Sequence, residues 1–149
     1  MQKLSKSLEE TRELARDFLA SLSVNNAGAT VIGLSGDLGS GKTAFTQAIA
    51  RELGVAENIT SPTFVLEKIY PVKLPVGNHG TSKFQKLIHV DAYRLESGEE
   101  LLKLGFGELL QDKSNLIIIE WVERVREILG EFREIDFKFI DEQTREIRY

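Results

Sequence analysis

The sequence predicts a three-layer α/β domain, in which a largely parallel central sheet has helices on both faces and antiparallel strands at its edge. Three short apolar stretches predict the parallel strands, at residues 30–35, 87–91 and 116–120. Helical patterns alternate with these strands, as is typical of parallel sheets. A chain of 149 residues can bury a sizeable core, so we expect a single domain over residues 1–149.

The first half of the chain predicts two helices around the first strand. Ser7 and Glu10 have the spacing of a capping box, and an apolar stripe follows it. Residues 44–53 predict a second helix that ends at Gly54. The predicted buried faces are Leu8, Ala15, Phe18, Leu19 and Leu22 in the first helix, and Phe45, Ile49 and Leu53 in the second.

A strand and a loop follow the second helix. Residues 64–70 alternate and are rich in β-formers, which predicts a strand. Residues 59–63 cluster hydroxyl groups, which indicates either a loop that senses a γ-phosphate and magnesium or simply a Ser-Pro turn. Residues 71–83 contain two prolines and two glycines and predict an exposed loop.

The remaining elements cover the sheet and complete it. Residues 99–110 predict an amphipathic helix interrupted by glycines, and residues 122–129 predict a helix that ends at Gly130. Residues 134–140 and 145–149 alternate, which predicts an antiparallel hairpin at the edge of the sheet.

Composition narrows the classes of function. The net charge of −4 argues against broad electrostatic capture of RNA or DNA. The absence of cysteine excludes disulfides, thiolate metal sites and cysteine nucleophiles. The sequence shows no signal peptide and no membrane-spanning run, so we expect a cytoplasmic protein that does not engage a membrane.

Residues 36–43 match Gly-x-x-x-x-Gly-Lys-[Ser/Thr], the phosphate-binding loop, between a predicted strand and a predicted helix. The glycines let backbone N–H groups approach phosphate oxygens, and the helix directs its positive end at the same anion. Lys42 would reach the β- and γ-phosphates, and the Thr43 hydroxyl would hold magnesium. The sequence therefore predicts a P-loop NTPase fold that binds a nucleoside triphosphate.

Asp91 and Glu120 each end a predicted strand. Ligands of open α/β sheets lie beyond the carboxyl ends of the strands, so we expect both carboxylates beside the loop. One would hold magnesium, directly or through water, and the other would polarise the attacking water. Their positions in the sequence leave open which does which. His89 is expected to be a packed strand histidine rather than a ligand.

Taken together, these motifs resemble the TsaE (YjeE) family. Its members are small bacterial ATPases needed to make threonylcarbamoyladenosine next to the anticodon of tRNAs that read codons beginning with A. The resemblance runs from Ser7 to the end of the chain and is carried by residues 36–43, 60–64, 89–95 and 119–123.

The resemblance implies ATP and Mg²⁺ as ligands, with Lys42, Asp91 and Glu120 as catalytic residues and Thr43 and Glu120 on the metal. It implies that Asp91 is needed for hydrolysis and that Thr63 lies on a switch-like segment. Thr11 and Arg145 would flank the base or ribose. The residues expected to bind ATP are Thr11, Asp37, Leu38, Gly39, Ser40, Gly41, Lys42, Thr43, Ala44, Thr63, Trp121 and Arg145.

The resemblance also implies a weak ATPase that does not itself make the carbamoyl transfer. Such a protein would dock on the TsaB–TsaD pair and reset that complex between turnovers, and it would meet tRNA only through the complex. Two alternatives use the same loop. One is a small-molecule kinase, although the long loop at residues 71–83 lacks the arginine typical of a kinase lid. The other is a nucleotide-gated binding module with negligible turnover.

Overall fold

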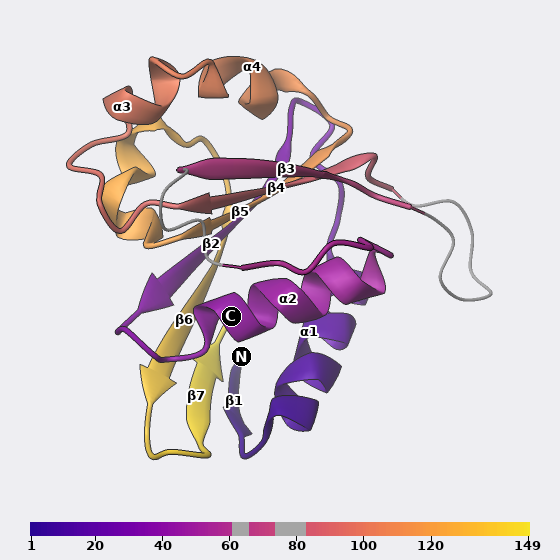
Figure 1. Ribbon diagram of the computed structural model, residues 1–149, viewed down its shortest axis with the longest axis vertical. Coiled ribbons are helices and arrows are strands. Elements are labelled where there is room, and N and C mark those ends of the chain that lie inside the picture. Colours follow the sequence, from indigo (N-terminus) through magenta and orange to yellow (C-terminus); the bar gives the residue numbers. More distant parts are fainter. Residues whose placement is uncertain (61–65, 74–82) are drawn as a thin grey trace.

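A seven-stranded mixed sheet forms the centre of the computed structural model, which describes residues 1–60, 66–73 and 83–149. The strands lie in the order β1-β7-β6-β2-β5-β4-β3, and helices cover both faces (Figure 1). This arrangement confirms the predicted α/β fold. The strands are β1 (Gln2–Ser5), β2 (Thr30–Gly36), β3 (Glu67–Pro71), β4 (Lys86–Asp91), β5 (Asn115–Glu120), β6 (Arg133–Phe139) and β7 (Arg145–Arg148).

Four neighbouring strands, β6, β2, β5 and β4, are parallel and form the middle of the sheet. Both edges are antiparallel, because β3 pairs with β4 at one side, and β7 and β1 extend the other. The predicted C-terminal hairpin is β6–β7, with Phe137 opposite Ile147. The hairpin does not end the sheet, since β1 covers β7. Only Ser5 is buried in β1, so this strand lacks the apolar alternation that would have predicted it.

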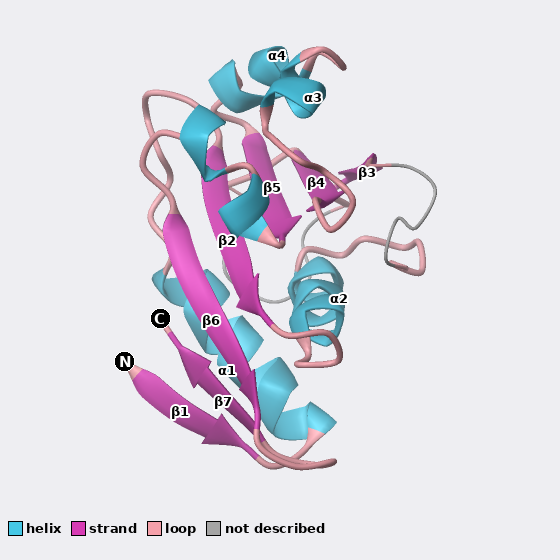
Figure 2. Cartoon of the chain, turned by 90° about the vertical axis from the view of Figure 1, so that its left-hand side faces the viewer, coloured by secondary structure: helices cyan, strands magenta, loops and turns pink. Residues whose placement is uncertain are grey.

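The helices are α1 (Leu8–Ser21), α2 (Lys42–Glu52), α3 (Glu99–Leu102) and α4 (Phe106–Gln111), with two 3₁₀ turns, η1 (Val122–Arg124) and η2 (Arg126–Ile128). Helices α1 and α2 pack on one face of the sheet (Figure 2). In the core beneath them, the ring of Phe45 makes edge contacts with Phe18 and Phe137. Helices α3 and α4 cover the other face through Leu101 and Phe106. Across the described residues, no helix has the length and apolar character needed to cross a membrane.

Three details of the helices differ from the prediction. The helix expected over residues 99–110 is two short helices, because Gly105 adopts φ +85° between them. The helix expected over residues 122–129 is the two 3₁₀ turns η1 and η2, separated by Val125, whose φ of −132° and ψ of 10° are not helical. Leu8 is 65% exposed although it belongs to the predicted stripe of α1, because it is the first residue of the helix and precedes the part that packs on the sheet.

Candidate functional site

The loop at residues 36–43 joins β2 to the N-terminus of α2, as its sequence predicted. Gly36 ends the strand with φ +124°, and a Cβ there would lie 2.1 Å from the carbonyl oxygen of Phe137 on β6. Gly41, with φ +106°, precedes the first residue of α2. The backbone can therefore turn tightly between strand and helix, and the amides at the start of α2 are directed into the space beyond the sheet.

The Lys42 side chain folds back over this loop. Its Nζ donates hydrogen bonds to the carbonyl oxygens of Gly36 at 2.6 Å and Asp37 at 2.8 Å, and it lies 4.1 Å from the centre of the Trp121 ring. Burial lowers the pKa of Lys42, while nearby carboxylates, Glu120 first among them, act in the opposite direction. The ammonium group is thus held by neutral carbonyl oxygens, and a negatively charged group in the adjoining space would attract it electrostatically.

Trp121 reaches this position through an unusual backbone conformation. Its φ is +62°, and it is the one residue other than glycine with a positive φ in the described part of the chain. A left-handed conformation costs a non-glycine residue about 1–2 kcal/mol. The Trp121 amide nevertheless donates to the carbonyl of Leu34 on β2 at 2.9 Å, and the ring packs against Tyr93 at 5.0 Å between centroids. The strained residue directly follows β5 and forms part of the wall around Lys42.

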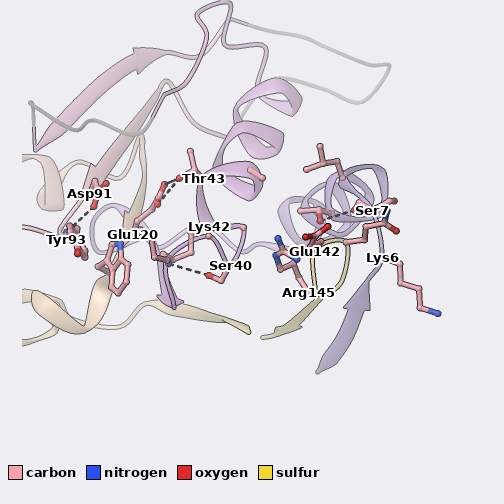
Figure 3. A pocket seen from close by; sticks show the side chains of 18 of the residues that line it. Lys6, Ser7, Ser40, Lys42, Thr43, Asp91, Tyr93, Glu120, Glu142 and Arg145 are labelled. Carbon is pink, nitrogen blue, oxygen red and sulfur yellow. Dashed lines mark hydrogen bonds between the residues drawn. The ribbon is translucent and has the colours of Figure 1, made fainter. Parts of the chain in front are cut away.

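Thr43 and Glu120 meet across the end of the sheet. The Thr43 hydroxyl lies 3.0 Å from each oxygen of the Glu120 carboxylate, although the two residues are 77 positions apart (Figure 3). Glu120 Oε1 is also 2.8 Å from Nε2 of His89. Glu120 is 3% exposed and His89 is fully buried. The prediction that His89 is packed within its strand holds, and the structure adds that its ring is bonded to Glu120.

Asp91 ends β4 directly beside Glu120, since the two residues are register partners in the parallel pair β4–β5. Its Oδ1 accepts a hydrogen bond from the amide of Tyr93 at 3.0 Å, which orients the carboxylate (Figure 3). No group of three or more acidic or histidine side chains arranged to hold a metal occurs among the described residues. A divalent cation here would therefore take oxygen ligands from Thr43, from one or two carboxylates and from a phosphate.

A cavity of about 900 Å³ lies beyond the carboxyl ends of these strands. The loop and the ends of β4 and β5 form one side of it, and the start of α1 and the turn between β6 and β7 form the other (Figure 3). The predicted site residues that line it are Thr11, Leu38, Gly39, Ser40, Gly41, Lys42, Thr43, Ala44, Asp91, Glu120, Trp121 and Arg145. The structure thus brings most of the predicted set together, while their roles stay predictions.

Two predicted residues stand apart from this set. The side chain of Asp37 does not line the cavity, although its carbonyl accepts from Lys42. Thr63 lies outside the described residues, as do the rest of residues 61–65 and residues 74–82. Thr11 and Arg145 line the cavity with polar groups already engaged: the Thr11 hydroxyl is 2.7 Å from Ser5 Oγ, and the Arg145 guanidinium lies 4.6 Å from the Phe139 ring.

Several lining residues were missed by sequence reasoning, namely Lys6, Ser7, Leu8, Leu66, Tyr93, Arg94, Glu142 and Gln143. The sequence indicates Ser7 only as a helix cap, and it does cap α1, since its Oγ accepts a hydrogen bond from the amide of Glu10 at 3.1 Å. Residues near the two ends of the chain carry no motif that connects them with the loop. Tyr93 and Arg94 lie two and three residues after Asp91, and this closeness in the sequence could have predicted that they line the same cavity.

The sequence and the structure of this chain both match known proteins of one family. The family model described as "Threonylcarbamoyl adenosine biosynthesis protein TsaE" matches residues 5–147. A Rickettsia felis protein named tRNA threonylcarbamoyladenosine biosynthesis protein TsaE is 40% identical over 139 residues, which is 92% of this chain and 72% of the relative. The Bacillus subtilis protein of the same name is 35% identical over 120 residues, 80% of this chain and 68% of the relative. The structure is also similar to the crystal structure of Bacillus subtilis YdiB, with a TM-score of 0.68 and 30% sequence identity. The match covers 99% of this chain and 82% of the YdiB chain.

Proposed function

This chain belongs to the TsaE family, whose proteins take part in tRNA threonylcarbamoyladenosine biosynthesis, and from that premise we propose that it binds and hydrolyses Mg-ATP to support this modification. The observation that carries the proposal is the convergence of Lys42, Thr43 and Glu120 at one end of the sheet, around a cavity of about 900 Å³. Ligand pockets commonly have volumes of roughly 300–1,000 Å³, so the cavity is large enough for a nucleotide.

In this proposal the loop at residues 36–43 binds the phosphates of ATP. Amides at the start of α2 donate hydrogen bonds to the phosphate oxygens, which the positive end of the helix also attracts. Lys42 exchanges its two carbonyl acceptors, Gly36 and Asp37, for the β- and γ-phosphates. The phosphates carry negative charge that the two carbonyls lack, so Coulomb attraction to the Lys42 ammonium favours the bound state.

The donor set also fits magnesium. Mg²⁺ prefers hard oxygen ligands and is usually bound through one or two carboxylates together with substrate phosphates. Thr43 and Glu120 offer such oxygens 3.0 Å apart beside the loop. When bound, the ion would neutralise charge that develops on the phosphates during hydrolysis. Thr43 and Glu120 would hold it in place.

Asp91 is then the residue that orients the attacking water. Glu120 is bonded to both Thr43 and His89, whereas Asp91 is the neighbouring carboxylate at the same edge of the sheet. The bond from the Tyr93 amide to Asp91 Oδ1 fixes the orientation of its carboxylate toward the cavity side of the strand end. Hydrolysis would need positioning and electrostatic stabilisation, and no covalent intermediate.

We propose further that this weak ATPase acts on the TsaB–TsaD pair in the cytoplasm and resets that complex between turnovers, meeting tRNA through the complex. The test is phosphate release from Mg-ATP by the purified chain, alone and then with TsaB–TsaD and tRNA. Slow release that rises with the pair supports the proposal. Release that ignores the pair but rises with a small metabolite indicates a kinase. Modification that proceeds equally well with a non-hydrolysable ATP analogue indicates a nucleotide-gated binding module.

A further inference from the structure

A histidine lies in the middle of an otherwise aliphatic layer of the sheet. His89 is fully buried, Leu87 lies on the same face of β4, and the register partner of His89 on β5 is Ile118. Burying a polar ring in such surroundings costs free energy unless the ring is hydrogen-bonded. A leucine would satisfy packing at this position without that cost. A buried imidazole at this position therefore indicates a hydrogen-bond partner that offsets the cost of burial.

The partner is the carboxylate of Glu120. Nε2 of His89 lies 2.8 Å from Glu120 Oε1, while Nδ1 is buried and finds no hydrogen-bond partner among the described residues. An ionised carboxylate only accepts hydrogen bonds, so Nε2 is assigned as the donor. Because Nδ1 has no partner among the described residues, His89 does not link Glu120 to a further polar group there. Its one polar contact in the described part of the chain is with Glu120.

From this geometry we propose that His89 is a positioning residue for Glu120, which it holds in the orientation that binds magnesium together with Thr43. The inference rests on the function proposed above. Residues of three elements fix the position of the Glu120 carboxylate. Glu120 ends β5, the Thr43 hydroxyl of α2 lies 3.0 Å from both carboxylate oxygens, and the His89 imidazole of β4 is hydrogen-bonded to Oε1. If Thr43 directed its oxygen toward a bound magnesium ion, the hydrogen bond from His89 to Glu120 would remain, because it does not involve the ligand.

Groups that orient a metal ligand have a characteristic energetic effect. Their loss typically weakens metal affinity by roughly 10- to 100-fold, because the ligand must then be ordered when the metal binds. Nucleotide affinity in the absence of metal depends on the loop and Lys42 and is expected to stay unchanged. Replacing a residue that merely fills the core would lower the melting temperature but would leave the metal affinity of the folded protein unchanged.

The test measures Mn²⁺ binding, by the electron paramagnetic resonance signal of the free ion, to the full chain saturated with the β,γ-imido analogue of ATP. His89→Leu removes the donor, and His89→Asn keeps an amide that is too short to reach Glu120. Both variants are expected to bind Mn²⁺ roughly 10- to 100-fold more weakly than the wild type. His89→Gln extends an amide nitrogen toward the position of Nε2 and is expected to restore most of the affinity. Ile118→Val, in the same layer of the core, is the matched control and is expected to leave Mn²⁺ binding unchanged.

Each outcome decides between the two proposals. Wild-type Mn²⁺ affinity in folded His89→Asn or His89→Leu overturns the role of His89 and leaves the proposed function intact. Equal losses in His89→Asn and Ile118→Val also overturn it, since the effect then follows from core packing. Absence of a nucleotide-dependent Mn²⁺ site in the wild-type chain overturns the proposed function, and the inference with it.

Discussion

Two glycines of the loop at residues 36–43 differ sharply in what surrounds them, which makes their replacement by alanine a test of the loop geometry. Gly36 has φ +124°, and a Cβ there would lie 2.1 Å from the Phe137 carbonyl oxygen and 3.0 Å from its carbon, both backbone atoms of β6. Gly39 has φ +75°, and a Cβ there would have no described atom within 4 Å. Gly36→Ala must therefore displace a strand, whereas Gly39→Ala changes only local backbone energy.

The expected magnitudes follow from this difference. A left-handed alanine costs about 1–2 kcal/mol, and the reduced entropy of the unfolded chain offsets about 0.4–1 kcal/mol. Gly39→Ala should therefore lower the free energy of unfolding by about 1 kcal/mol. At Gly36 the backbone strain is about 1–3 kcal/mol. Displacing β6 there weakens about two ladder hydrogen bonds, each worth about 1 kcal/mol. With the same offset from the unfolded chain, the sum is about 3 kcal/mol for Gly36→Ala.

Thermal unfolding followed by far-ultraviolet circular dichroism, without nucleotide, measures the two variants against the wild type. For a chain of this size, 1 kcal/mol corresponds to about 3 °C in melting temperature. We therefore expect Gly36→Ala to unfold about 9 °C below the wild type and Gly39→Ala about 3 °C below. Melting temperatures for the two variants that agree within about 3 °C would refute the reasoning, because the contact with β6 would then carry no cost.

The remaining predictions concern the site, the core and the hairpin turn. Lys42→Ala should lose about 3 kcal/mol of phosphate binding, a roughly 100-fold weaker affinity for ATP by calorimetry. Glu120→Ala should keep part of its nucleotide affinity but lose the dependence on magnesium, and unchanged magnesium-dependent binding in both variants would contradict the site. Phe45→Ala should lower the free energy of unfolding by about 4 kcal/mol in urea, and a loss below about 1 kcal/mol would contradict its packing. Backbone hydrogen bonds from two amides of the turn hold the pKa of Asp141 below its ordinary value of 3.8. The stabilisation from this carboxylate is present above that value and is lost as the pH falls through the lowered pKa. The difference in melting temperature between wild type and Asp141→Ala should therefore shrink on acidification, and a difference that grows would contradict this sign.

Much of the fold could be predicted because its signals are local. The buried strands β2, β4 and β5 are continuous apolar runs, and the hairpin β6–β7 alternates along its length. By contrast, β1 depends on pairing with a strand at the other end of the chain and carries no apolar pattern of its own. The helix expected over residues 122–129 failed for a related reason. Apolar spacing alone does not reveal that the preceding Trp121 is held at φ +62° by a bond to β2.

The sequence by itself determined the strand–loop–helix geometry at residues 36–43, because the glycines, Lys42 and Thr43 lie within eight consecutive residues and their geometry follows from the strand before them and the helix after them. It also placed Asp91 and Glu120 at the correct edge of the sheet, since parallel strands present their carboxyl ends together. The residue pattern left open which carboxylate meets Thr43, the resemblance implied Glu120, and the tertiary structure shows that contact. That contact joins residues 77 positions apart, and the buried imidazole of His89 on a third element completes it. Such contacts depend on strand order and register, which no local pattern of residues encodes.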